Sequence, residues 1–75
     1  MNTNRQLTAI ISHEEEGYVS LCPEFDIASQ GESVEEARKN LAEAFELFLE
    51  TADQTEIHER LHSEVFVSHL QVAVG

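Results

Sequence analysis

The clearest local signal in the sequence is Ser33-Val34-Glu35-Glu36, which follows Gly31-Glu32. A serine with a glutamate three residues later is typical of a capping box, in which each side chain accepts a hydrogen bond from the other residue's backbone N–H. This pattern predicts a helix that begins at Val34. At 100° per residue, the apolar side chains share an arc of about 140°. They are Val34, Ala37, Leu41, Ala44, Phe45, Phe48, Leu49 and Ala52. We expect this face to pack on a sheet and the opposite, charged face to contact water.

Three extended segments are expected before this helix. Residues 6–12 and 18–21 are rich in β-branched and apolar side chains, and a charged loop ending at Gly17 separates them. They predict a hairpin. Pro23 has no backbone N–H to donate, so the second strand should stop at Cys22 or bulge there. A third strand is predicted over residues 27–30, ending at Gly31.

The sequence after the helix predicts one ambiguous segment and one strand. Residues 53–64 are polar and place Ile57 and Leu61 four positions apart, which favours either a short helix capped by Asp53 or Thr55, or a linker. Residues 65–74 are rich in valine and predict a last strand. The expected fold is therefore α+β, with a mostly antiparallel sheet and one main helix packed on one face.

Composition and charge limit the class of function. The chain has 75 residues, of which 41% are hydrophobic, so we expect one domain over residues 1–75 with a small core that would gain from a partner. The net charge of −11 argues against direct binding of nucleic acid or an anionic membrane, and favours a basic protein partner. The single cysteine and the lack of an apolar run long enough for a membrane span or signal peptide predict a cytoplasmic protein.

Three arrangements could carry chemistry, and the sequence favours none of them. His58-Glu59-Arg60-Leu61-His62 matches the H-E-x-x-H pattern of zinc enzymes, but the segment has few apolar anchors, so two solvated histidines are the preferred interpretation. Cys22 is expected to be a buried, unreactive thiol. The carboxylates are not expected to converge into a metal site. We expect no catalytic residue, no metal site and no cofactor.

Several motifs recur in an order that resembles a known family. An aromatic residue follows a glycine in Gly17-Tyr18, Pro23 ends the second strand, and Ser29-Gln30-Gly31 precedes the capped helix. The helix ends in Glu43-Ala44-Phe45-Glu46-Leu47-Phe48-Leu49. Together these residues resemble the HicB family of antitoxins, closely over residues 6–50 and loosely over the last predicted strand.

The resemblance implies both a fold and a partner. The fold would be a partial ribonuclease-H-like β-β-β-α-β unit without the catalytic acids. Members of the family pair with a small basic HicA toxin, a ribonuclease with a double-stranded-RNA-binding fold that cleaves mRNA with a histidine, and they cover its active surface. Longer members carry a C-terminal DNA-binding domain, which is not expected here, so repression of its own operator by this chain alone is not expected.

The leading hypothesis is therefore a non-enzymatic antitoxin of a type II toxin–antitoxin pair. The candidate contacts are acids beside the strand ends with Phe25 as an anchor. They are Glu14, Glu15, Glu16, Glu24, Phe25 and Asp26. The alternative is an orphan HicB-like scaffold or ligand-binding module that acts as a homo-oligomer without a toxin. We expect a homodimer or tetramer. A third hypothesis, a metal-dependent hydrolase built on His58 and His62, predicts stoichiometric zinc.

Overall fold

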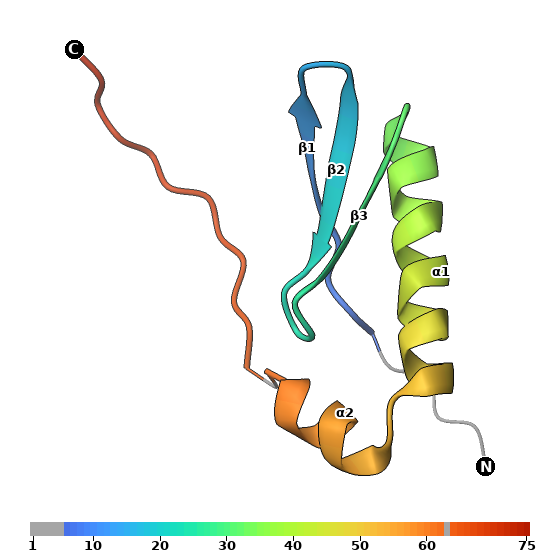
Figure 1. Cartoon of the computed structure of the whole chain (residues 1–75). Coiled ribbons are helices and arrows are strands. Elements are labelled where there is room, and N and C mark those ends of the chain that lie inside the picture. The colour runs from blue at the N-terminus through green and yellow to red at the C-terminus, as the bar shows by residue number, and fades with distance from the viewer. Residues whose placement is uncertain (1–5, 63) are drawn as a thin grey trace.

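The computed structural model describes residues 6–62 and 64–75. Its elements are β1 (Ile10–Glu14), β2 (Gly17–Cys22), β3 (Ile27–Gly31), α1 (Val34–Thr51) and α2 (Gln54–Arg60). The three strands form one antiparallel sheet in the order β1-β2-β3, and α1 packs against one face of it (Figure 1). The predicted α+β class, with a main helix on an antiparallel sheet, is thus confirmed. Within the described residues, no helix is long and apolar enough to cross a membrane.

The strand register determines which side chains face α1. Ser20 and Cys22 on β2 are buried, so the intervening Leu21 points to the opposite face of the sheet. Leu21 pairs with Ile10 on β1, and both belong to that outer face, where they are 39% and 40% exposed. The outer face of the sheet therefore presents apolar side chains that nothing in this copy covers.

β1 begins and ends later than the sequence predicts. The prediction for residues 6–12 is wrong at both ends, because the strand starts at Ile10 and pairs as far as Glu14 opposite Gly17. Thr8 donates its backbone N–H and its hydroxyl to the carboxylate of Glu24, at 3.0 and 2.7 Å, and so contacts a turn before the ladder begins. The end of β2 at Cys22 and the position of β3 agree with the predictions to within one residue.

The start of α1 confirms the predicted cap. The Glu36 backbone N–H donates to Ser33 Oγ at 3.0 Å, and the helix begins at Val34. The glutamate carboxylate accepts from the backbone N–H of Glu32 at 2.8 Å, one residue earlier than a strict capping box would place it. Asn40 then donates its side-chain N–H to the Gln30 carbonyl at 2.8 Å. These bonds tie the first turns of α1 to the end of β3.

The core is small and lies between the end of β2 and α1. Its buried cluster consists of Cys22, Phe25 and Leu41. The Phe25 ring packs edge-on against Phe45, with centroids 5.0 Å apart. Ser20, which is also buried, donates its hydroxyl to the Ala37 carbonyl at 2.8 Å. A core of this size agrees with the expectation that so short a chain buries little apolar area.

The chain after α1 differs from the predicted order of elements. A second helix does form: α2 is capped by Asp53, whose Oδ1 accepts from the Glu56 N–H at 2.8 Å. The predicted strand over residues 65–74 is wrong, because that segment joins no ladder and runs away from the sheet (Figure 1, orange to red). A high β propensity produces a strand only beside another strand, and these residues lie beside none. We call residues 65–74 the C-terminal arm.

Candidate partner-binding site

The six residues predicted to contact a partner lie at opposite ends of the sheet. Glu14 ends β1, and Glu15 and Glu16 form the turn to β2, whereas residues 24–26 belong to the turn between β2 and β3 (Figure 1). The six predicted residues therefore form two separate groups in the structure. Each half has a different environment.

Residues 24–26 make contacts inside the molecule. Phe25 is 2% exposed and belongs to the core, so its ring is not available as a surface anchor in this conformation. Partial burial raises the pKa of Glu24, but hydrogen bonds from the Thr8 hydroxyl and from backbone N–H groups outweigh it, and the net effect lowers the pKa below the ordinary value. Glu24 is therefore a charged acceptor that fixes the chain before β1.

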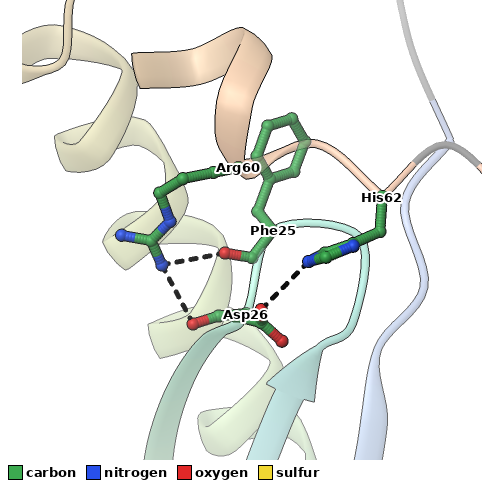
Figure 2. A network of polar contacts seen from close by, with 4 residues as sticks. All are labelled: Phe25, Asp26, Arg60 and His62. Atoms are coloured by element: carbon green, nitrogen blue, oxygen red, sulfur yellow. Dashed lines mark hydrogen bonds and ion pairs between the residues drawn. The ribbon is translucent and has the colours of Figure 1, made fainter.

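Asp26 joins this turn to the end of α2 (Figure 2). Arg60 donates from Nη2 to the carbonyls of Phe25 and Asp26, at 2.9 and 3.1 Å. His62 Nε2 lies 3.1 Å from Asp26 Oδ2, and the His62 backbone N–H donates to the Glu24 carbonyl at 2.6 Å. Asp26 has a φ of 56°, in the left-handed region that aspartate tolerates better than most residues. We call Asp26, Arg60 and His62, with the two carbonyls, the α2 junction.

The α2 junction also separates the two histidines of the H-E-x-x-H pattern. His58 lies on α2, but the helix ends at Arg60 and His62 follows its cap, turned toward Asp26. A shared zinc on one helix face requires both histidines within the same regular helix. Over residues 6–62 and 64–75, no group of three or more metal-binding side chains comes together.

The opposite end of the sheet carries an acidic depression of about 720 Å³. It lies between the β1–β2 turn and the start of α1. Five of its lining residues are glutamates, and Tyr18 also lines it. The full set is Glu14, Glu15, Glu16, Gly17, Tyr18, Val19, Gln30, Gly31, Glu32 and Glu36. We call this surface the acidic depression.

The acidic depression combines carboxylates from two parts of the chain. Tyr18 pairs with Gly31 across β2 and β3, so the residue after β3, Glu32, lies beside the first hairpin. The sequence pattern does not indicate Glu32 as a contact residue and predicts Glu36 only as part of the helix cap. Pairing the second and third strands with Tyr18 opposite Gly31 would have indicated this proximity. Such a concave group of exposed carboxylates suits guanidinium and ammonium groups.

Cys22 ends β2, and its Sγ lies 3.5 Å from Glu24 Oε1. Its side chain is buried, and burial raises the pKa of the thiol above the ordinary value, with neighbouring Glu24 acting in the same direction. The neutral thiol is a poor nucleophile, as the sequence predicts.

No family model, curated protein or solved structure matches this chain. The resemblance to the HicB family thus depends on the sequence motifs alone.

Proposed function

We propose that this chain is a HicB-like antitoxin that binds and occludes a small basic ribonuclease toxin of the HicA type. The observation that carries the proposal is the acidic depression, in which five glutamates surround a hollow beside Tyr18. A toxin that binds RNA must carry a basic surface, and a concave acidic surface attracts and covers such a surface. A partial ribonuclease-H-like fold is part of this proposal, and it requires a fourth strand beside β1.

The charge of the whole chain supports the same partner. Fifteen acidic residues against four basic ones give a net charge of −11, which steers a cationic protein toward any face of the molecule. Specific occlusion needs a defined contact in addition to this general attraction. The acidic depression provides concave shape, clustered charge and an aromatic residue at one place, and Tyr18 is the type of residue that anchors protein interfaces.

If a short basic protein is encoded beside this chain and arrests growth when expressed alone, it is the partner with which the proposal is tested. We expect co-expression of this chain to restore growth and the two purified proteins to form a complex. Replacing Glu15, Glu16 and Glu32 with glutamine should weaken the complex about ten-fold, which corresponds to ~1.4 kcal/mol. Binding should be measured by calorimetry, with growth rescue as a second readout.

The matched control removes the same charge from another exposed surface. Glu43, Glu46 and Glu50 are exposed residues of α1 outside the acidic depression. Their replacement with glutamine should leave affinity nearly unchanged. Equal weakening by both triple variants would mean that only net charge matters and would overturn the assigned site. Failure of the growth-arresting protein to bind would overturn the antitoxin function itself.

A further inference from the structure

The C-terminal arm is an apolar segment without contacts that bury it. Side chains alternate along an extended chain, so Phe66, Leu70, Val72 and Val74 lie on one side of it. These four side chains are between 70% and 90% exposed. The arm contains no aspartate, glutamate, lysine or arginine, although the chain as a whole is strongly acidic. A long, uncharged, β-favouring segment of this kind pairs readily with an exposed sheet edge.

Of the two edges of the sheet, the β1 edge is the more open to such pairing. On one side, α1 lies next to β3, and the Asn40 side chain donates a hydrogen bond to the Gln30 carbonyl. On the other side, β1 is hydrogen-bonded to β2, and no further backbone bond to β1 occurs within the described residues. β1 therefore presents a free row of N–H and C=O groups.

The exposed area of the chain corresponds to a missing interface. The molecule exposes 6537 Å². A compact protein of this mass exposes about 4,600 Å², so the excess is roughly 1,900 Å². Two such chains have an excess of about 3,800 Å² between them, which lies within the roughly 2,000–5,000 Å² that obligate homodimer interfaces bury in total. The radius of gyration of 14.5 Å likewise exceeds the value of about 11 Å for a compact chain of this length.

A second copy of the chain accounts for these observations together. If the arm folded back on its own β1, the outer face with Ile10 and Leu21 would stay uncovered. A second copy offers both a free edge for the arm and an apolar face of its own. The α2 junction fixes His62, three residues before the arm begins, and Figure 1 shows the arm leading away from its own sheet. We propose that two copies exchange their C-terminal arms, each arm adding as a fourth strand along β1 of the other copy.

The first test measures the mass of the intact chain by sedimentation. We expect a species of twice the 8.4 kDa chain mass. Replacing Leu70 and Val72 with lysine should produce a monomer, because the charges lie on the apolar side of the arm. The control replaces His69 and Gln71 with lysine, which adds charge at neighbouring positions on the other side. This control should remain dimeric, and circular dichroism should show the helices of both variants unchanged.

The second test decides whose β1 the arm contacts. A sample refolded from equal amounts of isotope-labelled and unlabelled chains gives filtered NMR contacts only between different copies. We expect such contacts between residues 10–14 and 65–74. A monomer at every concentration, or contacts found only within one copy, would overturn the proposal. No residue of the arm lines the acidic depression, so a failed toxin test leaves this proposal standing. A failed arm test would remove the fourth strand, and with it the ribonuclease-H-like fold, but it would leave the acidic depression as the toxin-binding site.

Discussion

At the scale of single residues, Gly31 is required because the chain approaches itself closely. A Cβ built at this position would lie 2.5 Å from the Ala37 backbone N and 2.8 Å from the Glu36 carbonyl carbon. Backbone atoms of a capped helix cannot move aside as a flexible side chain can. We expect Gly31→Ala to lower the free energy of unfolding by about 1–3 kcal/mol, as measured by urea denaturation.

The control for this substitution is Gly75→Ala, because a Cβ at Gly75 meets no atom within 4 Å. That variant should unfold at the same urea concentration as the parent chain. If Gly31→Ala were equally harmless, the close packing of β3 on the first turn of α1 would be refuted.

Glu24 should make stability depend on pH in the acid range. Its folded-state pKa lies below the ordinary value of 4.5, because hydrogen bonds centred on Thr8 outweigh the effect of burial. A lowered pKa means that the stabilisation is fully present above the unfolded-state pKa and is lost as the pH falls through the folded-state pKa. We expect the unfolding free energy of the parent chain to fall more steeply below pH 4.5 than that of Glu24→Gln.

The measurement is urea unfolding at several pH values between about 3 and 7. Glu50→Gln, at an exposed position of α1, is the reference for removing a carboxylate without removing these bonds. Identical pH profiles for Glu24→Gln and the parent chain would show that the Thr8 contact contributes nothing to stability.

At the scale of elements, α2 depends on Arg60. This side chain donates two hydrogen bonds to the β2–β3 turn, and its guanidinium lies 5.1 Å from the centroid of the Phe48 ring. We expect Arg60→Met to lower the unfolding free energy by about 1–2 kcal/mol and to speed amide exchange in α2. Arg38→Met, which removes the same charge from an exposed position of α1, should have little effect. If both variants lowered the unfolding free energy equally, the Arg60 contacts of the α2 junction would not be what stabilises α2.

The elements also show what local sequence can and cannot predict. The start of α1 follows from Ser33 and Glu36, and the end of β2 follows from Pro23, because caps and missing donors act within a few residues. The start of β1 was misplaced because Thr8 binds Glu24, a contact between residues 16 positions apart. The strand predicted over residues 65–74 does not form, because β propensity does not specify a partner strand. Local sequence does not indicate Glu32 as part of the acidic depression, because strand register, rather than spacing along the chain, brings it near Glu15.

At the scale of the whole molecule, net charge should act oppositely on the two proposed contacts. Two copies at −11 each repel one another, whereas a basic toxin is attracted. Raising the salt concentration from about 20 to about 300 mM shortens the range of both forces. We expect self-association to tighten and toxin binding to weaken, as measured by sedimentation equilibrium and calorimetry. A dimer that dissociates on adding salt would contradict association through the uncharged arm.

The order of the elements has a consequence for folding kinetics. β1 pairs with β2, β2 pairs with β3, and β3 lies against α1, so each of these four elements meets its neighbour in sequence. α2 differs, because Arg60 contacts the β2–β3 turn, which lies 34–35 residues earlier. Short loop closures of this kind give low contact order and rapid folding. The body of each copy should thus fold in a fast unimolecular step that is independent of protein concentration. Burial of the arm on another copy is a later, bimolecular step, and newly made chains at low abundance pass through a folded monomer with a bare arm.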